Sequence, residues 1–208
     1  KSYTDGQLKI SKHSTTQRHL NYFEIFEHYR ANSLFEQPES ENNLTMPSIE
    51  LTIRQAEAND VPQILQFIKE LADYEKLSPQ VTATEQALRN SLFGAQKSAE
   101  AVIAEQNKTP LGFALFFHNF STFEGRSGLY LEDIYVQPES RGKGVGTALM
   151  KHLAATALER NCARMEWSVL NWNENAIRLY KTLGSAPMNE WRVYRLTGEP
   201  LAKLAQKT

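Results

Sequence analysis

The chain has 208 residues, of which 41% are hydrophobic and 23% charged, and its net charge is −1. These proportions are typical of a globular protein and disfavour a coiled coil, a collagen-like chain and a fully disordered chain. The balance of 23 basic and 24 acidic residues disfavours a nucleic-acid surface, because neutralising phosphates needs a local excess of Lys and Arg. No apolar run approaches the roughly 20 residues of a membrane-spanning helix, so we expect no membrane partner. The one cysteine, Cys162, cannot form an internal disulfide, which favours a cytoplasmic setting.

The first 48 residues are polar and are predicted to form an N-terminal extension, followed by one domain over residues 49–208. Residues 37–43 have the composition of a linker. A short helix is predicted from a group of apolar residues: Leu20, Phe23, Ile25, Phe26 and Tyr29. We expect this helix to pack on its own domain or on a partner subunit, and the alternative is a separate binding function of the extension.

From residue 49 the pattern alternates between strand and helix. Residues 49–54 alternate apolar and polar side chains, which predicts a strand. Asp60 and Gln63 resemble a capping box that opens a helix with apolar residues every three or four positions. A second helix is predicted over residues 84–93, ending at Gly94.

Three strands are then predicted over residues 99–105, 111–118 and 129–136, the first two joined as a hairpin by a tight turn. A long helix is predicted from about residue 144 to residue 160. The remaining elements are a strand over residues 164–169, a helix over 173–183 and a last strand over 191–196. This order predicts a mixed α/β sheet flanked by helices.

A glycine-rich turn precedes the long helix. In Arg141-Gly-Lys-Gly-Val-Gly-Thr147, three glycines at alternate positions leave backbone N–H groups free to approach a ligand, and the helix start adds a positive dipole end. This suits a pyrophosphate, whereas a flexible loop is the alternative. The spacing matches neither GxxxxGK[ST] nor GxGxxG, so a P-loop and a dinucleotide fingerprint are disfavoured.

The apolar strand before this turn carries two adjacent carboxylates, Glu132 and Asp133. Burying an unpaired carboxylate is costly, so we expect both to face a polar cleft, where they act as a general base or attract a cationic substrate. A bulge that exposes them, or structural pairing with Arg, is the alternative.

These residues resemble a known family. The run from Leu131 to Thr147 is similar to the coenzyme A signature R/Q-x-x-G-x-G/A of the GNAT superfamily of N-acetyltransferases, and residues 172–184 resemble its second motif. Three shorter segments, residues 69–75, 130–133 and 190–192, resemble the spermidine/spermine branch, which includes diamine and thialysine acetyltransferases. The resemblance implies a mostly antiparallel central sheet flanked by helices, with a splayed strand pair that holds coenzyme A.

The resemblance also implies a role for each matched residue. Tyr180 is the general acid that protonates the leaving thiolate. Glu132 is our candidate general base, because a primary amine at neutral pH is mostly ammonium and must lose a proton before it attacks. The amine substrate is bound by Tyr74, Glu75, Glu132, Asp133 and Trp191. Acetyl-CoA, the cosubstrate, is bound by Ile134, Tyr135, Val136, Arg141, Gly142, Lys143, Gly144, Val145, Gly146, Thr147, Asn173 and Asn175.

Several of these residues have a purely structural role as the alternative. Tyr180 and Trp191 are then core aromatics, and Tyr74 and Glu75 form a solvated helix end. The branch has an acidic residue two positions before the tryptophan, where this chain has Asn189. Unless Glu190 takes its place, this weakens spermidine or spermine as the substrate and leaves room for a shorter diamine or a thialysine-like amino acid. Alternative functions are acetylation of a protein or peptide amine and non-catalytic acyl-CoA binding. A homodimer is implied by the branch, and no metal is expected.

Overall fold

The structure, a computed structural model, describes residues 51–206, which form a mixed α/β fold around one sheet. Within the described part of the chain the sheet has five strands in the order β1-β2-β3-β4-β5, antiparallel except for the parallel pair β4 and β5. The mostly antiparallel sheet that the family resemblance implies is therefore confirmed. The strands are β1 (Leu51–Gln55), β2 (Glu100–Gln106), β3 (Thr109–Ser121), β4 (Arg126–Val136) and β5 (Met165–Trp167).

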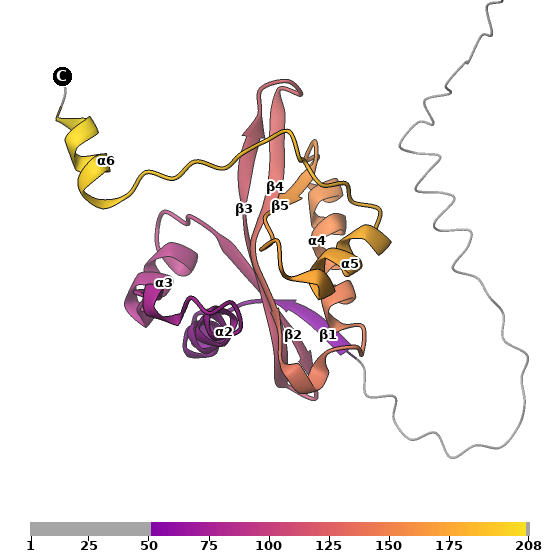
Figure 1. The fold of residues 1–208 in the computed structure, drawn as a ribbon. Coiled ribbons are helices and arrows are strands. Elements are labelled where there is room, and N and C mark those ends of the chain that lie inside the picture. The colour runs from indigo at the N-terminus through magenta and orange to yellow at the C-terminus, as the bar shows by residue number, and fades with distance from the viewer. Residues whose placement is uncertain (1–50, 207–208) are drawn as a thin grey trace, which may run out of the picture. The chain divides into compact units, whose positions relative to one another are not determined.

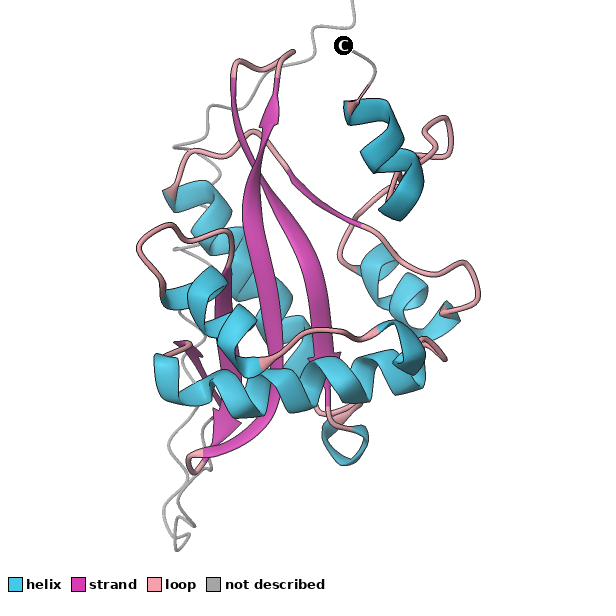
Figure 2. Cartoon of the chain, turned by 90° about the vertical axis from the view of Figure 1, so that its left-hand side faces the viewer, coloured by secondary structure: helices cyan, strands magenta, loops and turns pink. Residues whose placement is uncertain are grey.

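Helices cover both faces of the sheet (Figures 1 and 2). Helices α2 (Val61–Tyr74) and α3 (Glu85–Phe93) lie on one face, and α4 (Val145–Glu159) and α5 (Glu174–Thr182) on the other. A further helix, α6 (Gly198–Ala205), buries none of its residues. Short 3₁₀ turns span Ala58–Asp60, Ser78–Gln80 and Pro138–Ser140. None of the helices in residues 51–206 has the length and hydrophobicity to cross a membrane.

The two sides of the sheet have separate apolar cores. Alternate residues of a strand point to opposite faces, so neighbouring positions of one strand serve different cores. The α2 and α3 side buries Ile64, Phe67, Leu92, Ile103, Phe113 and Tyr135, among others. The α4 and α5 side buries Phe116, Leu129, Leu131, Leu149, Leu153 and Tyr180, among others.

The hairpin between β2 and β3 forms as predicted. Asn107 and Lys108 have φ values of 51° and 64°, and positive φ at both central residues is typical of the type I′ turn that matches strand twist. The predicted helices after residues 60, 84, 144 and 173 are confirmed, and Thr84 caps α3 by accepting a hydrogen bond from the Ala87 N–H at 3.2 Å.

A β-bulge in the middle of β4 sets up the site. Leu115 of β3 pairs with Asp133 and its neighbour Phe116 pairs with Leu131, so Glu132 is an extra residue without a partner on β3. The alternation of β4 shifts there by one position: Leu129 and Leu131 face the α4 side before the bulge, whereas Ile134 and Val136 do so after it.

Strands β4 and β5 separate at the same level. They pair only through residues 129–131 of β4 and Met165–Trp167 of β5. Beyond Leu131 no strand among residues 51–206 lies beside the β5 edge of β4, which confirms the expected splayed pair and leaves backbone groups of this edge available to a ligand.

Two local predictions were wrong. The Asp60 side chain does not cap α2, because it accepts hydrogen bonds from Arg54 at 2.7 and 2.8 Å and from the Glu57 N–H at 2.7 Å. The predicted last strand over residues 191–196 is irregular, and Val193 and Tyr194 are 85% and 88% exposed. A strand needs a hydrogen-bonding neighbour, and no strand of the described sheet lies beside this segment. The predicted extension over residues 1–48 and its helix lie outside the described residues.

Candidate active site

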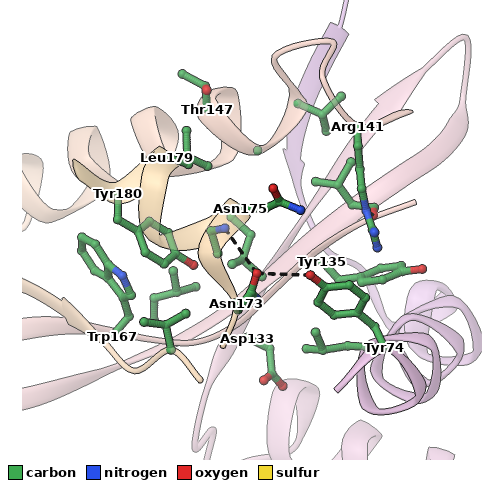
Figure 3. A pocket seen from close by; sticks show the side chains of 18 of the residues that line it. Tyr74, Asp133, Tyr135, Arg141, Thr147, Trp167, Asn173, Asn175, Leu179 and Tyr180 are labelled. Atoms are coloured by element: carbon green, nitrogen blue, oxygen red, sulfur yellow. Dashed lines mark hydrogen bonds between the residues drawn. The ribbon is translucent and has the colours of Figure 1, made fainter. Parts of the chain in front are cut away.

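A pocket with a volume of about 540 Å³ opens where β4 and β5 separate (Figure 3). Four segments line it: the end of α2, the second half of β4, the glycine-rich turn with the start of α4, and residues 167–180. Its size lies in the range of small-molecule sites. The pocket therefore joins segments that are up to about a hundred residues apart in the sequence.

The glycine-rich turn forms one end of the pocket. Gly142 and Gly144 have φ values of 73° and 85°, a backbone region that other residues rarely adopt. Gly144 precedes the first residue of α4, so the free N–H groups of the first helical turn lie at the pocket. The Arg141 Nε donates to the Val136 carbonyl at 2.9 Å, which leaves both of its Nη groups available. Free N–H donors, a helix N-terminus and a guanidinium fit a pyrophosphate.

Three carboxylates gather at the other part of the pocket: Glu75 at the end of α2, and Glu132 and Asp133 at the bulge. Adjacent strand residues normally point to opposite faces, and the bulge allows both β4 carboxylates to line one pocket. Glu132 is exposed, whereas Asp133 is half-buried. Burial, followed by the charges of Glu132 and Glu75, raises the pKa of Asp133 to about 6. Burial also raises the pKa of Glu75.

Tyr180 reaches the pocket from α5. It is 8% exposed, and its ring packs against Trp167 with centroids 5.0 Å apart. Burial, followed by the charge of Glu75, raises the pKa of the phenol to about 12, so the hydroxyl keeps its proton at neutral pH. A buried, protonated phenol can donate to an anion that forms beside it.

Asn173 and Tyr74 meet across the pocket. The Tyr74 hydroxyl donates to the Asn173 Oδ1 at 3.2 Å, drawn as a dashed line in Figure 3. The same oxygen accepts the Ala176 N–H at 3.3 Å and so caps α5. Asn175 lines the pocket, and its Oδ1 accepts a hydrogen bond from Arg178. The Tyr74 side chain is thus held by protein contacts rather than projecting freely as a solvated helix end.

Most of the residues predicted for the site line this one pocket, but two do not. Lys143 lies in the turn without lining the pocket. Trp191 lies on the irregular segment after α5 and is 70% exposed, so it is not a core aromatic either. The sequence did not single out several lining residues, of which Trp167 is the most notable because it packs on Tyr180. The parallel pairing of Trp167 with Leu131 of the carboxylate strand is the signal that identifies it.

The chain is similar to known acetyltransferases. The model of the acetyltransferase (GNAT) family matches residues 65–184. The chain is 41% identical over 166 residues to a thialysine N-epsilon-acetyltransferase from Bos taurus, covering 74% of this chain and 97% of that protein. It is 33% identical over 163 residues to spermidine/spermine N(1)-acetyltransferase-like protein 1 from Homo sapiens, covering 74% of this chain and 23% of that protein.

Among solved structures, an integron cassette protein from the mobile metagenome of V. cholerae superposes with a TM-score of 0.64 at 30% identity. The match covers 76% of this chain and 98% of that chain.

Proposed function

The chain belongs to the GNAT family of acetyltransferases, and from this premise we propose that it acetylates a small primary amine in the pocket described above. The observation that carries the proposal is the presence, in one pocket, of a pyrophosphate-type turn, three carboxylates and a buried tyrosine hydroxyl. Acetyl-CoA, the cosubstrate of the family, supplies the acetyl thioester. We propose that residues 141–147, except Lys143, bind its pyrophosphate and that the free edge of β4 at residues 134–136 lies beside its pantetheine arm.

Two proton transfers are needed, and the pocket offers a group for each. The amine must lose a proton before its lone pair forms the new C–N bond, and the departing thiolate must gain one as the C–S bond breaks. Tyr180 is suited to the second transfer, because its phenol is protonated and buried. The transfer is direct in this proposal: the described pocket lining contains no cysteine or histidine, and Cys162 is buried outside it.

The three carboxylates are suited to binding the substrate ammonium and to accepting its proton. Asp133 is half-buried and has its pKa raised to about 6, so at neutral pH it is a carboxylate with an unusually strong tendency to take a proton or to pair with a cation. Glu132 is exposed and can exchange a proton with solvent. We propose that Asp133 and Glu75 hold the substrate ammonium, and that Glu132 accepts its proton directly or through water.

The substrate proposed is a small molecule with two ammonium groups on a short chain. Three carboxylates favour a substrate with two ammonium groups over one with a single ammonium group. Among the lining residues that the structure describes, Arg141 is the one cation, and it belongs to the phosphate end. Thialysine, diamines and polyamines all carry the second ammonium. Thialysine is the first candidate, because relatives 40–42% identical to this chain are thialysine acetyltransferases. A lysine within a protein lacks that second ammonium, which makes protein acetylation the second candidate.

A homodimer is also proposed. The segment after α5 and helix α6 expose apolar side chains that a folded protein normally covers: Trp191, Val193, Tyr194, Leu201 and Leu204. We propose that a second copy of the chain covers these side chains. We also propose a reducing cytoplasmic compartment, where Cys162 stays a thiol. Sedimentation of the full chain tests this. A variant that ends after residue 189 is expected to sediment as a monomer, and an unchanged dimer contradicts the role of the segment.

The substrate proposal is tested by release of free thiol from acetyl-CoA with a panel of amines. The panel holds thialysine, putrescine, spermidine, spermine, lysine, a short lysine-containing peptide and, as the matched control, butylamine. We expect turnover with at least one diammonium compound and a much lower kcat/KM with butylamine. Turnover with the peptide alone would move the substrate class to proteins, and coenzyme A binding without turnover on any amine would favour a non-catalytic module.

A further inference from the structure

Tyr74 contacts three separate segments of the pocket. It is the last residue of α2, and its hydroxyl donates to the Asn173 Oδ1 at the start of α5. Its ring lies 5.6 Å from the Trp172 ring, and the Arg141 guanidinium lies over its face at 4.9 Å. One side chain thus connects α2, the glycine-rich turn and the segment that begins α5.

The direction of the hydrogen bond follows from the helix cap. The Ala176 N–H can only donate, so the Asn173 atom that it contacts is the amide oxygen. Tyr74 must then be the donor to the same oxygen, which has two lone pairs and can accept both. Breaking this hydrogen bond therefore removes a restraint on the start of the helix that carries Tyr180.

The hydrogen bond also crosses between the two faces of the sheet. Helix α2 lies on one face and α5 on the other, and Tyr74 meets Asn173 over the opening between β4 and β5 (Figures 1 and 3). Residues on both sides of this link line the same pocket. Glu75 directly follows Tyr74, so the restraint on Tyr74 also positions a carboxylate of the proposed amine site.

The contact between Arg141 and Tyr74 connects the proposed coenzyme site to the hydrogen bond between Tyr74 and Asn173. A guanidinium forms hydrogen bonds in its plane and stacks through its face, so the two contacts do not compete. The Arg141 Nε is held by the Val136 carbonyl, its Cζ lies over the Tyr74 ring, and its Nη groups remain for a phosphate. A phosphate that fixes Arg141 thereby fixes the ring of Tyr74, and with it the end of α2.

We propose that Tyr74 is a positioning residue that couples coenzyme binding to amine binding, so that each ligand raises the affinity for the other. The inference rests on the proposed function, since it places the coenzyme at Arg141 and the amine at Glu75. The coupling is reciprocal, because linkage requires the same factor in both directions. Tyr74 acts through Asn173, Arg141 and Glu75 rather than by touching the reacting atoms.

Calorimetric titration of the full chain tests the coupling. Thialysine, or another amine that the thiol-release panel identifies, is titrated with and without saturating coenzyme A, which lacks the acetyl group and allows no turnover. We expect the coenzyme to tighten amine binding by about 3- to 10-fold, the range of one hydrogen bond, and Tyr74→Phe to abolish most of this factor. The reverse titration must give the same factor.

A matched tyrosine provides the control. The Tyr130 hydroxyl bonds the Ser168 hydroxyl at 2.9 Å, so Tyr130→Phe also removes one tyrosine hydrogen bond, but between β4 and the residue that follows β5. We expect Tyr130→Phe to keep the wild-type coupling factor. A wild-type protein without coupling, or a Tyr74→Phe protein that keeps it, overturns the inference while thiol release upholds the proposed function. Failure of the wild-type protein to bind or acetylate any amine overturns both.

Discussion

Replacing Asp133 by asparagine is expected to make the protein more stable and less active. Asparagine has the shape of the protonated acid and no charge, so the variant resembles wild-type protein in which Asp133 has kept its proton. Burial and the charges of Glu132 and Glu75 raise the pKa of Asp133 from 3.8 to about 6, which means that the folded state disfavours the carboxylate. Removing the charge relieves that cost and removes the group proposed to hold the substrate ammonium.

The size of the gain follows from the pKa difference. The unfolded chain loses this proton at lower pH than the folded chain, so wild-type stability falls as the pH rises from about 4 to about 6 and then levels off. A difference of about 2.2 pKa units corresponds to about 3 kcal/mol at pH 8, at 1.36 kcal/mol per unit. The same relation leaves about half of this difference at pH 5, where Asp133 is protonated in most of the folded protein.

Urea unfolding of the wild-type and Asp133→Asn proteins at pH 5 and pH 8 measures both numbers. The variant should be the more stable protein at both values of pH, and its advantage should be larger at pH 8. Asp73→Asn is the matched control, because Asp73 is exposed on α2, and its effect should stay within about 0.5 kcal/mol. A variant that is less stable than wild type at pH 8, or an advantage that does not change with pH, would refute the reasoning.

Three further predictions concern the other parts of the site. Tyr180→Phe should keep coenzyme A affinity and lower kcat by about 10-fold or more, measured by thiol release; an unchanged kcat, with chemistry limiting the rate, contradicts the role of general acid. Glu132→Gln should lose most activity at neutral pH and recover at high pH, where the amine is already deprotonated, whereas a rise in KM alone would assign Glu132 to binding. Gly144→Ala should destabilise the protein by about 1 kcal/mol in urea unfolding, because the φ of 85° at this position is strained for alanine. The variant should also bind coenzyme A more weakly, and wild-type stability and affinity would contradict the role of this turn.

Much of the site could be predicted from the sequence because its residues fall in two short local patterns. The glycine-rich turn and the Asn173–Gly184 segment each combine turn chemistry with a helical period, and these features depend on neighbours in the chain. The adjacent carboxylates Glu132 and Asp133 were noticeable because the strand around them is apolar. Their convergence on one pocket depends on a bulge, which arises from the pairing of β4 with β3 and leaves no clear local pattern.

The C-terminal part was harder to predict for the same reason. Residues 191–196 have the composition of a strand, but strand formation depends on a neighbouring edge rather than on composition alone. Asp60 illustrates the point at the other end of the domain. Its spacing to Gln63 fits a capping box, yet the bidentate hydrogen bonds from Arg54, which is on β1, take its carboxylate instead. In both places the local structure depends on residues far away in the sequence, which a local pattern does not reveal.

The most direct test of the central claim, that acetyl transfer occurs in one step within this pocket, is the initial rate of thiol release with acetyl-CoA and the amine varied together. Both substrates must be bound at once for the amine to attack the thioester, so double-reciprocal plots should give intersecting lines, and no thiol should be released before amine is added. Parallel lines, with a burst of thiol from acetyl-CoA alone, would show an acetylated protein intermediate and contradict direct transfer to an amine held by Asp133 and Glu75.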